Sequence, residues 1–139
     1  MREDNMETQN IAPESTKTQW SIDMEWFEKN NRSLPDLARR GLCSKCVEKL
    51  AKKKKKAETP DILAAIKDCC GKTPEFVTGK MPLLESIFRI MLANGNEPMN
   101  DQEISKQLGE RRGIGGYPVS PASLDRLLSN DKWYGFKKV

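Results

Sequence analysis

The sequence predicts a mainly α-helical protein with a small β element, in which a four-cysteine helical module precedes a second helical domain. Three observations lead to this prediction. All four cysteines lie within residues 42–71. Apolar side chains recur three or four positions apart over residues 83–92, as on the buried face of a helix. The final segment, residues 133–139, is rich in aromatic side chains, which is typical of a β-strand.

The four cysteines form two pairs that suit a metal site. Cys43 and Cys46 make a C-x2-C pair, and 22 residues separate it from the adjacent Cys69 and Cys70. A C-x2-C pair presents two thiolates to one tetrahedral ion, and a distant second pair can complete the shell. Adjacent cysteines reach one ion only where the backbone turns, and we expect Gly71 to end a helix there in a left-handed conformation. The pattern therefore predicts one structural zinc ion bound by all four thiolates.

Other uses of four thiols stay open at this point, namely an iron–sulfur cluster, a redox dithiol or disulfide, and four unrelated thiols. A secreted disulfide framework is disfavoured because the N-terminus lacks the pattern of a signal peptide. A thioredoxin-like motif is disfavoured because the C-x2-C pair lacks βαβ surroundings. The chain contains no histidine, which excludes a histidine ligand and a histidine general base. We therefore expect neither an enzyme nor a small-molecule substrate.

Composition divides the 139 residues into three parts. We expect residues 1–21, which are rich in small polar side chains, to be a disordered tail. Residues 22–78 are expected to form the zinc module, and residues 79–139 a second domain. No apolar run approaches the length of a membrane span, and no targeting segment is visible. The sequence therefore predicts a soluble, cytoplasmic protein without membrane contact.

The basic charge is concentrated beside the first cysteine pair. The whole chain has a net charge of +4, yet residues 39–56 carry nine basic side chains against Glu48 alone. Residues 57–139 carry eleven basic and eleven acidic side chains and are neutral. Four thiolates on a divalent ion leave a charge of −2 that nearby lysines would partly neutralise, whereas a lysine run can also bind phosphates. Both interpretations stay open.

Side chains that can accept a hydrogen bond from a first-turn amide precede several predicted helices. In the first half these helices cover residues 24–29, 34–40 and 60–68, and the capping residues are Asp23, Ser33 and Thr59. A further helix is expected to leave the first cysteine pair at Val47.

The second half shows the same signals. Asn100 and Glu103 form a capping-box pattern before a helix that we expect to end at Gly109. Ser120 opens a further helix after a glycine-rich loop, and residues 97–99 form a short extended link.

The order of helix, extended link, helix, loop, helix and strand over residues 80–139 resembles small bacterial and archaeal winged helix-turn-helix domains, including HARE-type domains. The resemblance places residues 121–129 at the position of the recognition helix and implies DNA binding by a transcription regulator. The family usually has a two-stranded wing, whereas this chain ends after one strand. Either the wing is truncated, or residues 97–99 pair with the last strand.

The expected partner is DNA, alone or with proteins of a transcription assembly. The contacts are expected from basic and hydroxyl side chains in both modules, namely Arg39, Arg40, Lys52, Lys53, Lys54, Lys55, Lys56, Arg111, Arg112, Ser120, Ser123, Arg126 and Lys132. The alternative is an adaptor that binds proteins and not DNA, because winged helices with neutral faces also bind proteins. Trp133, Tyr134 and Phe136 are the aromatic side chains expected to be exposed for that role.

Overall fold

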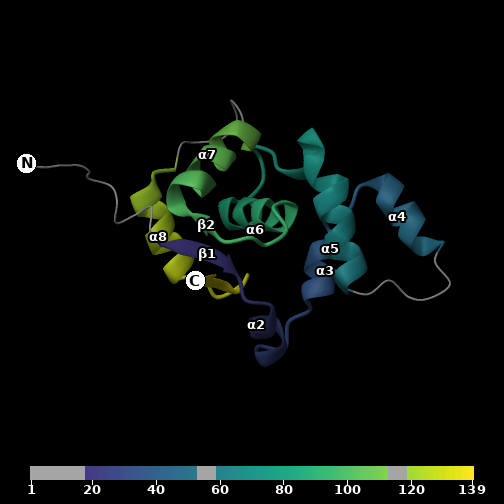
Figure 1. Cartoon of the computed structure of the whole chain (residues 1–139), viewed down its shortest axis with the longest axis horizontal. Helices are drawn as coiled ribbons and strands as arrows, with labels where there is room; N and C mark the ends of the chain where they lie inside the picture. Colours follow the sequence, from purple (N-terminus) through teal and green to yellow (C-terminus); the bar gives the residue numbers. More distant parts are fainter. Residues whose placement is uncertain (1–17, 53–58, 113–118) are drawn as a thin grey trace, which may run out of the picture.

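The computed structural model describes residues 18–52, 59–112 and 119–139 (Figure 1). These residues form seven α-helices, two short 3-10 helices and three strands, which confirms a mainly helical chain with a small β element. In chain order the elements are β1 (Gln19–Ile22), α2 (Met24–Lys29), α3 (Leu34–Arg39), α4 (Ser44–Ala51), α5 (Thr59–Asp68), η1 (Cys70–Lys72), η2 (Pro74–Phe76), α6 (Leu83–Ala93), β2 (Met99–Asn100), α7 (Asp101–Arg112), α8 (Pro121–Ser129) and β3 (Phe136–Lys138).

Capping side chains occupy four helix starts, as predicted. Each accepts a hydrogen bond from an amide in the first turn, and each therefore satisfies a donor that has no partner within its helix. The pairs are Asp23 with Glu25, Ser33 with Asp36, Asn100 with Glu103, and Ser120 with Ser123. The Glu103 carboxylate also accepts from the Asn100 amide at 3.2 Å, which completes the predicted capping box. Local sequence therefore sets where these helices begin.

Two predicted element ends differ in the structure. Helix α7 does not end at Gly109 but continues to Arg112. Gly109 is exposed on that helix, so the packing imposes no break there. Strand β3 covers only Phe136–Lys138, because Trp133 and Tyr134 belong to the turn that precedes it.

The short strand β1 lies at the centre of the sheet. Its partners β2 and β3 both run antiparallel to it, and Trp20 lies opposite Met99 on one side and Lys138 on the other. The Asn96 side chain adds two hydrogen bonds to the backbone of Ile22, at 2.8 and 2.9 Å. The predicted disorder is therefore wrong for residues 18–21, because pairing on both edges and burial of Trp20 order this segment.

β3 pairs with β1, and β1 separates it from β2. The expectation that residues 97–99 could pair with the last strand is therefore wrong. A strand from the N-terminal part of the chain occupies the place beside β3.

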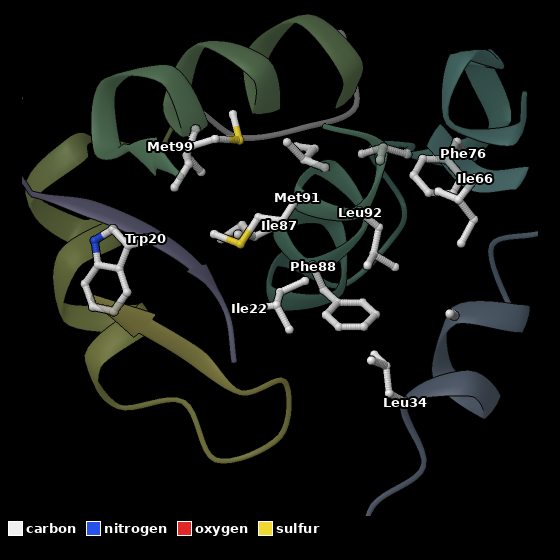
Figure 2. Packing of buried hydrophobic residues seen from close by; sticks show 14 of the residues in the cluster. Trp20, Ile22, Leu34, Ile66, Phe76, Ile87, Phe88, Met91, Leu92 and Met99 are labelled. Atoms are coloured by element: carbon white, nitrogen blue, oxygen red, sulfur yellow. The ribbon is translucent and has the colours of Figure 1, made fainter. Parts of the chain in front are cut away.

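Helix α6 is the centre of the hydrophobic core. It packs against α5, α7, η1 and β1, and its Ile87 and Met91 side chains are fully enclosed (Figure 2). One hydrophobic cluster contains buried residues on both sides of residue 78, including Phe76 from the cysteine segment, residues 42–78, and Leu92 from α6. The cysteine segment and the C-terminal helices therefore contribute to one core.

Candidate metal centre

Four cysteine side chains from neighbouring elements converge on one point. Cys43 is the N-cap residue of α4 and Cys46 lies in its first turn, while Cys69 follows α5 and Cys70 begins η1. The four sulfur atoms all lie within 4.8 Å of one another. The sequence predicted that a helix would begin at Val47, after the first pair. This prediction is wrong, because α4 begins at Ser44, between the two cysteines of the pair.

The sulfur separations suit one tetrahedral ion. The Sγ atom of Cys43 lies 3.4 Å from that of Cys70 and 3.8 Å from that of Cys69. Four Zn–S bonds of about 2.3 Å place tetrahedral sulfur ligands about 3.8 Å apart. A disulfide would require a separation of about 2.05 Å, and all four thiols are free. The donor set and its spacing therefore fit a metal site such as a zinc site.

A break after α5 brings the adjacent cysteines to the same site. On a regular helix of 3.6 residues per turn, successive side chains point about 100° apart. Cys69 leaves the helical conformation, with φ −135° and ψ −71°, and the chain continues as the 3-10 helix η1. The backbone turn that the sequence required therefore lies at Cys69.

Gly71 contributes its small size. Its predicted left-handed conformation is wrong, because the described glycines with positive φ are Gly95 and Gly135. A Cβ atom on Gly71 would lie 2.6 Å from the Cβ of Ala93 and 2.7 Å from the carbonyl oxygen of Ile66. η1 therefore packs so closely against the ends of α5 and α6 that a side chain at this position does not fit.

The environments of the thiols differ. The Cys43 amide donates a hydrogen bond to the Cys70 sulfur at 3.1 Å. A backbone hydrogen bond from Cys46, followed by a side-chain hydrogen bond with Cys70, lowers the pKa of the Cys43 thiol to about 7. Burial raises the pKa of the Cys46 and Cys70 thiols. A bound metal would displace protons from these buried thiols, since thiolates are the ligating form.

Arg111 and Arg112, which the sequence assigned to DNA contact, bind the backbone carbonyls of Gly71 and Gly79, which follow the second cysteine pair. Arg111 Nη1 donates to the Gly71 carbonyl at 2.8 Å, and its Nε donates to Gln107 at 3.2 Å. Arg112 Nη2 donates to the Gly79 carbonyl at 3.2 Å. Burial lowers the pKa of Arg111. These bonds give both guanidinium groups a packing role that the sequence did not predict.

Arg89 is a further residue that sequence reasoning missed. From α6 it donates to the carbonyls of Phe76 and Arg40, at 3.0 and 3.2 Å, and pairs with Glu85 at 3.3 Å. It thereby joins α6 to Arg40, which precedes the first cysteine pair in the sequence, and to Phe76, which follows the second pair. The i,i+4 pair with Glu85 can be read from the sequence, but the carbonyl partners Phe76 and Arg40 lie 13 and 49 positions away and leave no local pattern.

The basic residues near the first cysteine pair are only partly free for contact. Arg39 pairs with Asp36 at 3.3 Å, whereas Arg40 and Lys52 are exposed. The remaining predicted lysines, Lys53, Lys54, Lys55 and Lys56, lie outside the described residues.

The other predicted contact residues lie on or after α8. Ser120, Ser123, Arg126 and Lys132 are all exposed. The Ser120 hydroxyl caps the helix and donates to the Ser123 hydroxyl at 2.9 Å. Figure 1 shows α8 and α4 at opposite ends of the view, so the structure divides the predicted nucleic-acid contacts into two groups.

No family model, curated protein or solved structure matches the chain. No helix in the described part of the chain combines the length and the apolar character needed to cross a membrane.

Proposed function

We propose that this chain is a zinc-containing DNA-binding protein, of the class of transcription regulators, that contacts duplex DNA through α8. The observation that carries the proposal is the polar outer face of this helix. Leu124 and Leu128 are buried, whereas the side chains on the opposite face are exposed. The exposed face consists of Ala122, Ser123, Arg126, Ser129 and Asn130.

The chemistry of this face suits base edges in a major groove. Ser, Asn and Arg side chains donate or accept hydrogen bonds there, and arginine binds guanine in a bidentate manner. The order of α6, β2, α7, α8 and β3 is also the order that a winged helix implies, and α7 packs against α8. The exposed polar face and the order of the elements support a recognition helix over Pro121–Ser129.

Basic side chains after α8 can contact phosphates beside such a groove. Lys132 and Lys137 are exposed, and Lys138 lies 3.9 Å from Asp125 and above the ring of Trp20. Counterion release by such cations supplies the affinity that does not depend on sequence. The exposed Arg40 and Lys52 form a second basic group at the cysteine segment.

The proposed zinc ion has a structural role, in which it attaches α4 to the rest of the protein. Among the described residues of α4, Cys46 alone is buried. A helix with so little buried apolar surface gains little stability from packing, so bonds from Cys43 and Cys46 to a shared ion would supply the attachment. The four sulfurs lie within 4.8 Å of one another, which favours one ion over a multinuclear iron–sulfur cluster.

The test is a duplex-DNA titration of protein with measured metal content, at low salt and at about 0.15 M salt. We expect one zinc per chain and an affinity that falls steeply with salt. Replacing Arg126→Gln should weaken binding by about tenfold. The matched control is Lys67→Gln, an exposed cation on α5, which should change binding much less. Equal effects of the two substitutions would contradict a recognition role for α8.

The alternative proposal is a protein-binding adaptor, which one observation favours. Arg111 and Arg112 are committed to the carbonyls of Gly71 and Gly79, which leaves fewer cations for DNA in the C-terminal part. Of the three aromatic side chains expected to be exposed, Trp133 is exposed, while Tyr134 and Phe136 are half-buried. Absence of duplex binding even at low salt would select the adaptor.

A further inference from the structure

Trp133 is a large apolar side chain held on the surface by an ordered turn. Its side chain is 57% exposed. The Asp131 carboxylate accepts hydrogen bonds from the amides of Trp133 and Tyr134, each at 3.0 Å. The Tyr134 ring in turn packs against Phe88 at 5.2 Å between centroids. The backbone that carries Trp133 is therefore anchored to the core while the indole faces solvent.

One face of the indole is already occupied by a cation. The guanidinium carbon of Arg32 lies 5.4 Å from the ring centroid, within the range of a cation–π contact. The Arg32 amide donates to the Phe27 carbonyl at 2.8 Å, and its Nε is buried without a hydrogen-bond partner in the described structure. Arg32 therefore lies over one face of the ring, and the 57% exposure of Trp133 leaves much of the indole open to solvent.

Two cations neighbour Trp133, namely Arg32 over its ring and Lys132 beside it in the chain. Burial raises the pKa of Tyr134, Glu85 and Asp131 add to this rise, and Arg40 and Arg32 oppose it. Glu85 is paired with Arg89, and Asp131 holds the turn. Lys132 is exposed next to Trp133 in the chain. The surface therefore combines an exposed aromatic side chain with two neighbouring cations.

We propose that Trp133 stacks on an unpaired base of single-stranded DNA, while Arg32 and Lys132 contact the adjoining phosphates. Proteins that bind single strands combine aromatic side chains, on which bases stack, with a cationic path for the backbone. A base on the open face would complete a sandwich of guanidinium, indole and base. This inference extends the proposed DNA-binding function, because it adds an unpaired segment to the duplex contact of α8.

The experiment compares a single-stranded DNA oligomer of about twelve nucleotides with a duplex of the same sequence. Binding is followed by anisotropy of the labelled DNA and by quenching of tryptophan emission. We expect the single strand to quench wild-type emission, and Trp133→Leu to lose this quenching and bind the single strand about tenfold more weakly. Trp133→Tyr should retain most of the affinity, since tyrosine also stacks. Val139→Ala, at another exposed apolar side chain, is the matched control and should bind like the wild type.

Several outcomes would overturn the proposal. Unchanged single-strand affinity in Trp133→Leu would remove the stacking contact. Equal weakening for single strand and duplex would show that the contact is not with an unpaired base, and much tighter binding of an RNA oligomer of the same sequence would overturn the assignment to DNA. Self-association that Trp133→Leu abolishes, without DNA binding, would make this surface a protein interface. If the wild type binds the single strand but not the duplex, and Trp133→Leu weakens single-strand binding, the function proposed for α8 is contradicted and the stacking contact is supported.

Discussion

The guanidinium of Arg111 donates a hydrogen bond to the carbonyl oxygen of Gly71 at 2.8 Å, across 40 positions of sequence. Gly71 is buried and follows directly after Cys70, so this bond joins α7 to the turn that carries the second cysteine pair. The position of this turn, and with it the spacing of the sulfur atoms, therefore depends partly on a side chain from the C-terminal half.

Substitution Arg111→Met should lower the free energy of unfolding by about 1–3 kcal/mol, because the buried Gly71 carbonyl loses its partner. Urea unfolding followed by circular dichroism measures this change. Arg126→Met, at an exposed arginine on α8, is the control and should stay within about 0.5 kcal/mol of the wild type. Equal stabilities of the two variants would show that the bond to Gly71 contributes nothing.

Two glycine substitutions should have opposite effects on stability. Gly71→Ala places a methyl group 2.6 Å from the Ala93 Cβ, so we expect a loss of about 1–3 kcal/mol from overpacking. Gly109→Ala lies within α7 with nothing in reach of the added methyl, and should stabilise the protein by about 0.5–1 kcal/mol. Thermal unfolding of both variants checks the signs. A tolerated alanine at residue 71 would contradict the close packing of η1.

Removing one cysteine should release α4 without unfolding the core. In Cys70→Ser we expect the zinc content to fall from one ion per chain to none, because the ligand shell is incomplete. Hydrogen exchange should then accelerate in α4, where Cys46 alone is buried, but not in α6, whose Ile87 and Met91 are enclosed. Metal analysis and exchange mass spectrometry measure the two effects.

Ser44→Ala, an exposed position beside the first pair, is the control for this experiment and should keep both the zinc and the protection of α4. Loss of protection throughout α6 in Cys70→Ser would instead show that the whole core depends on the metal.

The pH dependence of stability should reveal the buried carboxyl of Asp101. Burial raises its pKa above the ordinary 3.8, and Asp125 adds to the rise while hydrogen bonds from the backbone oppose it. The folded chain therefore retains this proton to higher pH than the unfolded chain does. The stability contributed by the protonated group is fully present below pH 3.8, the ordinary pKa. It is lost as the pH rises through the raised pKa of the folded chain.

Asp101→Asn removes this titration, so the variant should gain stability relative to the wild type between about pH 4 and about pH 7. Urea midpoints at the two pH values measure the gain. Asp68→Asn, at an exposed carboxylate at the end of α5, should stay close to the wild type at both. A constant difference between Asp101→Asn and the wild type would contradict a raised pKa.

Some features of the candidate site could be predicted because they depend on ligand type and local geometry. The four thiols were identifiable as one group from their spacing, and their sulfurs do lie within 4.8 Å of one another. The required backbone turn was also predicted, but its cause was not. The turn occurs at Cys69, and the absence of a side chain at Gly71 is explained by Ala93, which lies 22 positions later. Such a contact leaves no trace in the local sequence.

The sequence by itself determined the four capped helix starts, the mainly helical class and the cysteine set, but not the start of α4, which begins at Ser44 and not at Val47. Caps and apolar periodicity act within a few residues, and they therefore survive as patterns that can be read along the chain. Only the tertiary structure decided that residues 19–22 form the central strand and that Arg111 faces Gly71. A strand of four residues has too few side chains for a clear alternation, and it is ordered by partners near residues 100 and 137 that become its neighbours only after the chain has folded.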